Sequence, residues 1–177
     1  MAYLPMISGG GAMKEGIYLC ENCSPIMTSN TAPSGTASAS NSASGYEPWR
    51  AMKGVDTANT DRWGTSGNVE NAYIQYMYPS AVVINRVEFK LRAESRRTAD
   101  TAHDCQIKIQ GSNDGSTFTD LGTFDEYATD ADYIKIHVLD NTTAYKYYRM
   151  QYVGYNVIYN NTHYCGMALL RLYYQNV

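Results

Sequence analysis

Short runs of alternating apolar and polar residues, separated by turn residues, constrain this chain more than any other feature. The runs cover 87–92, 105–110, 134–138 and 148–152, and a period of two is typical of strands with one buried face. The second run leads into residues 112–115, Ser-Asn-Asp-Gly, which favour a tight turn between antiparallel strands. No stretch indicates a helix longer than a turn or two. The pattern therefore predicts an all-β antiparallel sandwich.

The composition suits a single soluble domain with a substantial core. The chain has 177 residues, of which 44% are hydrophobic and 18% charged. A net charge of −3 gives no general reason to bind nucleic acid or an anionic membrane, and no apolar stretch approaches a membrane span. Tyrosine is the outlier, with 17 copies against 3 phenylalanines. Its flat ring and polar tip suit interfaces, although tyrosine is also simply a good strand residue.

Residues 1–25 are expected to form a docking arm, followed by one domain at 26–177. The arm is glycine-rich and carries scattered apolar residues without a sustained period. We expect it to dock on another subunit; the alternative is a disordered tail. Its start lacks the basic residues and unbroken apolar run of a signal peptide. Assembly into a phage particle released by lysis is a route out of the cell that needs no such signal.

The sequence gives little support for catalysis. It contains three histidines, but no serine in a nucleophile elbow, no His-Glu-x-x-His and no phosphate-binding loop. Two acid pairs, Asp125/Glu126 and Asp130/Asp132, flank a predicted hairpin. A glycosidase needs two carboxylates across a cleft, whereas acids beside a hairpin are expected to form a solvated face. The chain is therefore predicted not to be an enzyme.

The four cysteines leave their chemistry open. Cys20 and Cys23 form a C-x-x-C pair, which fits half of a zinc site, a redox pair or an incidental spacing. A zinc ribbon needs a second such pair, and the sequence has none. Cys105 is in phase with Ile107 and is predicted to be a small core residue. A disulfide to the distant Cys165 would need an oxidising compartment, which nothing in the sequence indicates.

Five further motifs occur in an order that points to a known family. They are Trp49-Arg50-Ala51-Met52-Lys53-Gly54, Trp63, Tyr73-Ile74-Gln75-Tyr76, Tyr147-Tyr148-Arg149-Met150 and Leu169-Leu170-Arg171-Leu172-Tyr173. With the hairpin between them, their order and spacing resemble the discoidin family, also called coagulation factor V/VIII C-type domains. Its bacterial relatives are the family 32 carbohydrate-binding modules. The resemblance covers residues 26–174 and implies an eight-stranded jelly-roll of the galactose-binding type, with long loops at one end.

Two segments carry the chemistry of a sugar site, which needs aromatic faces and planar donors and acceptors. Segment 92–103 follows a strand, as the family's arginine-bearing loop does, and Arg92 is the best match to that arginine. Segment 154–164 alternates tyrosine with asparagine and histidine, which combines rigid rings with adaptable amides. The alternative is that both loops merely cap the sandwich. The predicted ligand-binding residues are Arg92, Arg96, Arg97, His103, Tyr155, Tyr159, Asn160, Asn161 and His163.

The resemblance also raises the question of a structural calcium ion. The family often holds one in the loop before its tryptophan, where Asp56, Asn59 and Asp61 supply hard oxygen donors here. Two of the family's acidic positions fall at Lys53 and Leu169, so two anionic ligands are missing. The Lys53 ammonium could instead hydrogen-bond the loop. We therefore expect no cofactor to be required, and the fold to survive removal of divalent ions.

The function expected from the sequence is a structural virion protein, such as a phage decoration, head-fibre or tail-associated subunit. It would display a module that binds a host-surface glycan, contact other virion subunits through its arm, and form a homo-oligomer. The alternative is a glycan-binding module of a secreted bacterial enzyme or adhesin, located outside the cell or on its surface. Neither setting involves nucleic acid or membrane insertion.

Overall fold

The described part of the chain is a sandwich of two antiparallel sheets. The computed structural model describes residues 24–54, 61–91, 105–126, 134–154, 157–159 and 162–174. Their elements are β1 (Thr36–Ala39), the 3₁₀ helix η1 (Pro48–Met52), β2 (Trp63–Gly64), β3 (Tyr73–Val82), β4 (Arg86–Leu91), β5 (Cys105–Ser112), β6 (Thr119–Glu126), β7 (Lys135–Val138), β8 (Tyr145–Val153), β9 (Val157–Tyr159), β10 (Thr162–Tyr164) and β11 (Gly166–Tyr173). None of the described helices is long and apolar enough to cross a membrane.

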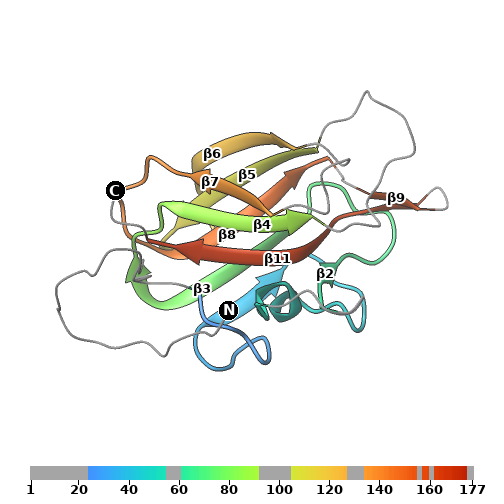
Figure 1. The fold of residues 1–177 in the computed structure, drawn as a ribbon, viewed down its shortest axis with the longest axis horizontal. Coiled ribbons are helices and arrows are strands. Elements are labelled where there is room, and N and C mark those ends of the chain that lie inside the picture. Colours follow the sequence, from blue (N-terminus) through green and yellow to red (C-terminus); the bar gives the residue numbers. More distant parts are fainter. Residues whose placement is uncertain are drawn as a thin grey trace.

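The strands form two sheets that face each other across one core. The five-stranded sheet has the order β1-β3-β8-β5-β6, and the four-stranded sheet has the order β2-β11-β4-β7, while β9 and β10 pair only with each other. In Figure 1, β4 and β11 lie in front of β3, β5 and β8. The largest fully buried side chains are Trp63, Tyr76, Tyr148, Tyr152, Phe89, Met27, Ile74, Ile84, Leu91, Ile107, Ile109 and Met150. The predicted antiparallel sandwich is confirmed.

The predicted hairpin is confirmed in detail. Strands β5 and β6 pair in antiparallel fashion, with Gln110 opposite Asp120. At the turn, the Asp114 carboxylate accepts hydrogen bonds from the backbone N–H groups of Thr117 and Ser116, at 2.7 and 2.8 Å. These bonds hold the pKa of Asp114 well below its usual range. Gly115 has a φ of 75°, which favours glycine. The Asn-Asp-Gly sequence therefore forms the predicted turn between β5 and β6.

Alternation correctly marks the core face of β4 but gives the opposite result for β7. Phe89 in β4 is buried, as the pattern indicates. In β7, which pairs with β4 and is the last strand of its sheet, Ile136 and Val138 point outward and are 52% and 65% exposed. Lys135 and His137 point inward instead, toward Glu126. The apolar face of this edge strand is therefore its solvent face.

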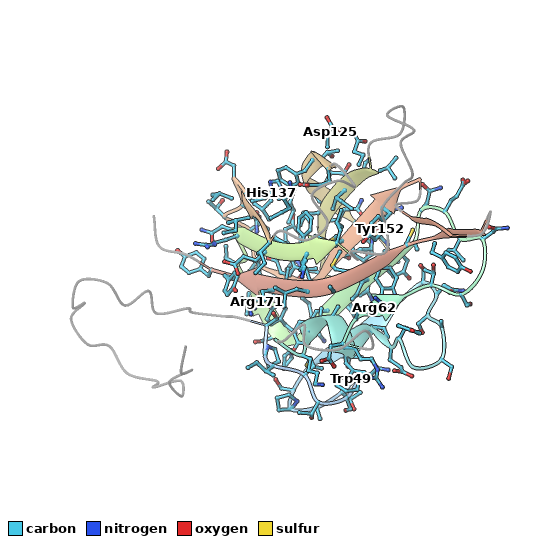
Figure 2. All side chains as sticks on the ribbon, turned by 45° about the vertical axis from the view of Figure 1, so that its right-hand side comes forward. Trp49, Arg62, Asp125, His137, Tyr152 and Arg171 are labelled. Carbon is cyan, nitrogen blue, oxygen red and sulfur yellow. The ribbon has the colours of Figure 1, made fainter. Side chains whose placement is uncertain are left out.

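The prediction that Asp125 and Glu126 both form a solvated face is wrong for Glu126. Asp125 is exposed, and its side chain lies at the edge of the molecule (Figure 2). Glu126 is only 2% exposed and bonds His137 Nε2 at 2.6 Å, with Lys135 Nζ at 3.5 Å. A buried carboxylate needs partners of this kind to offset the loss of hydration, and an inward-turned β7 supplies them.

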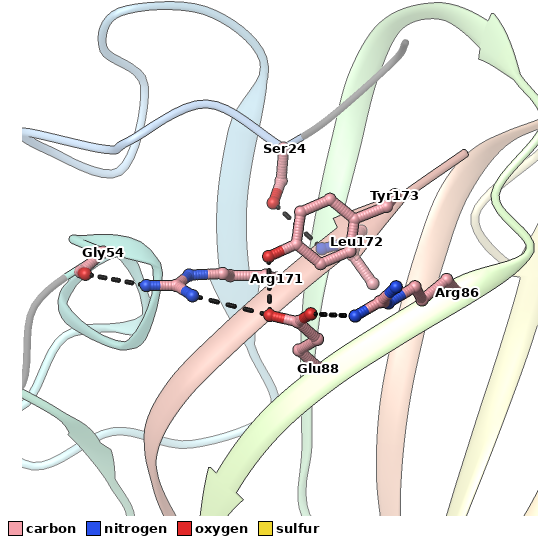
Figure 3. Close-up of polar contacts among 7 residues, drawn as sticks. All are labelled: Ser24, Gly54, Arg86, Glu88, Arg171, Leu172 and Tyr173. Carbon is pink, nitrogen blue, oxygen red and sulfur yellow. Dashed lines mark hydrogen bonds and ion pairs between the residues drawn. The ribbon is translucent and has the colours of Figure 1, made fainter. Parts of the chain in front are cut away.

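The outer face of the four-stranded sheet carries a polar cluster that ties distant segments together. Glu88 accepts bonds from Arg86 Nη2 at 2.7 Å and from the Tyr173 hydroxyl at 2.7 Å, and Arg171 Nη1 lies 3.4 Å away (Figure 3). Arg171 Nη2 also donates to the Gly54 carbonyl at 3.0 Å. The cluster therefore joins β4 and β11 to the residues that follow η1.

The first described residue is already docked on this sheet. The Ser24 N–H donates to the Leu172 carbonyl at 3.0 Å, and the Leu172 N–H donates to Ser24 Oγ at 3.2 Å (Figure 3). Ser24 thus lies beside the C-terminal half of β11. The rest of the predicted arm, residues 1–23, lies outside the described residues.

Candidate functional site

Both predicted site segments leave the sandwich at the same end. Leu91, the last residue of β4, pairs with Met167 near the start of β11. On the other sheet, Gln106 near the start of β5 pairs with Val153, the last residue of β8. The Tyr152 hydroxyl donates to the Gly166 carbonyl at 2.6 Å and so joins the two sheets at this point. We call this the loop end, defined by Leu91, Cys105, Val153 and Gly166.

Strand direction brings further connections to the loop end. The links β2–β3, β4–β5, β6–β7 and β8–β11 all begin or finish there, because each joins strand termini on that side of the sandwich. The predicted segment 92–103 lies in the connection from β4 to β5, and the predicted segment 154–164 lies in the connection from β8 to β11, which contains β9 and β10. The strand termini that flank the two predicted segments therefore lie at the same end of the sandwich, although the segments are more than fifty residues apart in sequence.

The second segment contains a short hairpin that the sequence did not predict. Strands β9 and β10 pair with Tyr159 opposite Thr162 and His163 opposite Ile158. In Figure 1, β9 projects beyond the sandwich next to the start of β11. The backbone thus presents Tyr159 and His163 on a projecting element.

The remaining predicted ligand-binding residues fall outside the described residues. They are Arg92, Arg96, Arg97, His103, Tyr155, Asn160 and Asn161. Only the backbones of Tyr159 and His163 are described. Their assignment to a sugar site therefore stays a prediction, with the strand termini locating the segments that carry them.

Two sets of hydrogen bonds hold the base of the loop end, and sequence reasoning missed both. Thr65 N–H donates to the Cys165 carbonyl, and Cys165 N–H donates to Thr65 Oγ1, each at 2.9 Å. Asn71 N–H donates to the Gly154 carbonyl at 2.6 Å, and Gly154 N–H donates to Asn71 Oδ1 at 2.7 Å. Asn71 has a φ of 55°, a conformation that asparagine tolerates. The sequence signal for this contact was Asn71 itself, an asparagine just before the run that becomes β3.

The loop 41–46 borders the same end along β2. Ala43 N–H donates to the Gly64 carbonyl at 2.8 Å, and the Trp63 indole N–H donates to the Asn41 carbonyl at 2.9 Å. The Arg62 guanidinium lies 5.3 Å from the centre of the Tyr46 ring. Arg62 is buried beneath this ring, so the loop offers Tyr46 as a second aromatic side chain bordering the loop end.

One residue of the predicted calcium loop is described, and it is already bonded to a cation of the protein. Asp61 is 3% exposed, and its Oδ1 accepts from Lys53 Nζ at 2.7 Å. Asp56 and Asn59 lie outside the described residues. Among the described residues, no group of three or more potential metal ligands occurs. The ammonium of Lys53 thus satisfies Asp61 at the position where the family resemblance implied an acid.

In a comparison with known protein families, residues 35–168 of this chain match the family described as "F5/8 type C domain". The chain belongs to the F5/8 type C domain family. The match begins just before β1 and ends within β11, so it covers most of the sandwich and both segments at the loop end. The family expected from the sequence is confirmed. A search of curated protein sequences found no match.

Solved structures similar to this F5/8 type C domain include carbohydrate-binding modules. One is chitosan-binding module 1 of a chitosanase/glucanase from Paenibacillus sp. IK-5, with 25% identity, 82% of this chain and 99% of that chain covered, and a TM-score of 0.59. Another is the family 32 module of Clostridium perfringens NanJ in complex with galactose, with 12% identity, coverages of 79% and 93%, and a TM-score of 0.58. A third is the family 32 module of AlyQ in complex with 4,5-unsaturated mannuronic acid, with 14% identity, coverages of 77% and 92%, and a TM-score of 0.55.

The domain therefore has the fold of a carbohydrate-binding module. In the relatives this module is a non-catalytic domain, although in some of them it is attached to an enzyme. The two structures below 25% identity show the fold alone. Chitosan, galactose and unsaturated mannuronic acid are ligands of those proteins.

Proposed function

We propose that this chain is a non-catalytic glycan-binding module that contacts its sugar at the loop end. The observation that carries the proposal is the family match across the sandwich, together with 25% identity to a chitosan-binding module over nearly its full length. Segments 92–103 and 154–164 bring arginine, histidine, tyrosine and asparagine to that end. Those residue types supply the stacking faces and planar hydrogen-bonding groups that sugar rings and hydroxyls require.

The same relative supports amino sugars as the ligand class. A chitosan-binding module recognises a hexosamine polymer, so amino sugars are the first ligands to test, with galactose as the second. A shallow site of this kind is expected to bind weakly, with a Kd on the order of 0.1–1 mM. Several copies on one assembly would raise the effective affinity without any new contact.

The test is titration of the purified chain with chitosan oligosaccharides, galactose and N-acetylgalactosamine. The double variant Arg97→Ala, Tyr159→Ala should lose binding without a change in melting temperature. The control Thr117→Ala, Lys146→Ala alters the β5–β6 turn and the start of β8, at the opposite end of the sandwich, and should bind like the parent chain. Binding by the loop variant at the parent affinity would place the site elsewhere, with the loop 41–46 next in line.

The setting of the module is a separate proposal: display on a virion, with a secreted bacterial enzyme or adhesin as the alternative. The position of Ser24 supports display, because it lies at the end of β11 away from the loop end. The enzyme origin of the chitosan-binding relative supports the alternative. Virion display predicts a homo-oligomer held by the arm, so the mass of the chain in solution separates the two. A monomer at micromolar concentration would favour the module of a larger secreted protein.

A further inference from the structure

The outer face of the five-stranded sheet holds an arginine between two aromatic rings. The guanidinium carbon of Arg149, in β8, lies 3.6 Å from the centre of the Phe118 ring and 4.8 Å from that of the Tyr73 ring. Phe118 directly precedes β6, and Tyr73 begins β3. Three segments that are distant in sequence thus converge on one cation. Both rings are partly buried and make cation–π contacts with it.

A chain of hydrogen bonds fixes the orientation of this arginine. Arg149 Nε donates to Gln110 Oε1 at 2.8 Å, and Gln110 Nε2 donates in turn to Asp120 Oδ1. The other oxygen of Asp120 accepts from Lys108 Nζ at 3.0 Å. The acceptor of the Arg149 Nε–H is therefore a neutral amide oxygen and not a carboxylate. Asp120 has both oxygens engaged by other residues.

The terminal nitrogens of Arg149 are left for a ligand. Within the described ranges, the polar partner of Arg149 is Gln110, and no carboxylate forms an ion pair with it. By contrast, Arg50, which lies 4.9 Å from the centre of the Trp49 ring, is neutralised by Glu47 at 2.6 Å. A guanidinium presents parallel N–H groups that match an oxyanion in two-point geometry. Arg149 retains that edge.

The surroundings strengthen the interaction of this cation with an anion. Partial burial lowers the pKa of Arg149 from its ordinary value, while Tyr73 and Asp120 oppose that shift. An arginine stays charged at neutral pH. Because the two rings have removed water from beside the guanidinium, an incoming oxyanion displaces less hydration than at a fully solvated arginine. The site is thus preorganised and partly desolvated.

We propose that this outer sheet face is a second ligand site, which binds the oxyanion of an acidic saccharide through the terminal nitrogens of Arg149. Register places Gln75 opposite Arg149 on β3, and Gln151 opposite Lys108 on β5. Both residues lie on the same sheet face as Arg149, and their neutral amides are donors and acceptors suited to sugar hydroxyls. The choice of a saccharide rests on the proposed glycan-binding function. The choice of an anion rests on the Arg149 contacts alone.

The test uses three probes: an oligomer of uronic acid, a sulfated oligosaccharide and a neutral oligosaccharide of the same length. Binding of the uronate oligomer would identify a carboxylate as the oxyanion, and binding of the sulfated probe would identify a sulfate. Arg149→Lys keeps the charge but loses the two-point geometry, and should weaken binding of the acidic probe by about tenfold or more. Arg149→Met should abolish that binding. Equal binding of the neutral probe would overturn the proposal.

Two controls separate this site from the loop end. Arg50→Met removes another arginine that lies over an aromatic ring, and should leave acidic-probe binding unchanged. The Arg97→Ala, Tyr159→Ala variant should also keep acidic-probe binding, so failure of the loop-end proposal and failure of this one are distinguishable. In an NMR titration, the side-chain amide signals of Gln110 and Gln75 should shift with the acidic probe. Parent-like binding by Arg149→Lys and Arg149→Met, or shifts confined to the loop end, would overturn the proposal.

Discussion

At the scale of single residues, several tyrosines are core residues whose hydroxyls form hydrogen bonds to backbone carbonyls. Tyr76, Tyr148 and Tyr152 are buried, and their hydroxyls donate to the carbonyls of Ser34, Val82 and Gly166 at 2.7, 2.7 and 2.6 Å. Tyrosine content predicted interfaces or ordinary strand positions. Its role as a hydrogen-bonded core residue was not predictable, because each acceptor lies on a segment distant in the chain.

Burial of tyrosine predicts a loss of stability at alkaline pH. Burial raises the pKa of Tyr78 well above the usual 10.0, with smaller contributions from Tyr76 and Tyr148. The unfolded chain therefore releases this proton at lower pH than the folded chain. The stabilising contribution is complete below pH 10 and is lost progressively as pH rises above it, by up to about 1.4 kcal/mol per pH unit for one such group.

Tyr78→Phe isolates this effect, because it removes the ionisable group and keeps the ring. Urea unfolding at pH 8 and pH 11 should show a smaller loss of stability in the variant than in the parent chain. Identical losses would show that Tyr78 does not contribute to alkaline unfolding.

The Lys53–Asp61 pair gives a second prediction at this scale. Replacing Lys53 by Met leaves the buried Asp61 carboxylate without its ammonium partner. The side chain of Lys53 is 39% exposed, so water offsets part of that loss. We expect destabilisation of about 1–2 kcal/mol, between the values for surface and buried pairs.

The same melts test the expectation about divalent ions. The parent chain should melt at the same temperature with and without a chelator, because an ammonium already satisfies Asp61. A drop of many degrees in chelator, reversed by calcium, would contradict this and restore the calcium loop at Asp56, Asn59 and Asp61.

At the scale of elements, alternation predicts strands well but does not say which face is buried. The β5–β6 hairpin and β4 follow directly from turn chemistry and period. In β7 the apolar residues point to solvent, because the inward positions are taken by partners of the buried Glu126. A carboxylate near the end of β6 decides the orientation of β7, and their pairing is not visible in the sequence.

The reversal of β7 predicts an inverted mutational pattern. Ile136→Ser should change the free energy of unfolding by less than about 0.5 kcal/mol, as exposed substitutions do. His137→Ser should cost about 2 kcal/mol or more, because His137 bonds Glu126 and stacks 3.8 Å from the Phe124 ring centre. Chemical unfolding of the two variants measures both values. A larger loss for Ile136→Ser would mean that β7 faces the core with its apolar side.

At the scale of the whole molecule, the family and the common end of the two loops were predictable from the sequence, whereas the site residues on those loops stay a prediction. The resemblance rested on motifs that lie in strands and in η1. These elements form the sandwich itself, so their residues carry the pattern of the family. The contacts of Arg149 could not be predicted, because they join β3, β8 and the residue before β6. Cross-strand neighbours depend on register, and the sequence does not reveal register between distant strands.

The entry of the chain into the domain gives the last prediction. One backbone hydrogen bond and one bond from the Leu172 N–H to Ser24 Oγ join Ser24 to β11, so the predicted boundary at residue 25 cuts through a structural contact. Deletion of residues 1–23 should leave a monomer with the parent melting temperature. Deletion of residues 1–25 also removes those two bonds, and should lower stability by about 1–2 kcal/mol.

The two deletions together separate attachment from folding. If the arm serves attachment, the shorter deletion abolishes oligomer formation, measured by light scattering, while sugar binding by each subunit is unchanged. Ser24 lies at the end of β11 away from the loop end, so the shorter deletion keeps every described residue of the domain and of the predicted site. Unfolding of the shorter deletion would instead make the arm part of the core, and an intact oligomer would place the subunit contact on the domain itself.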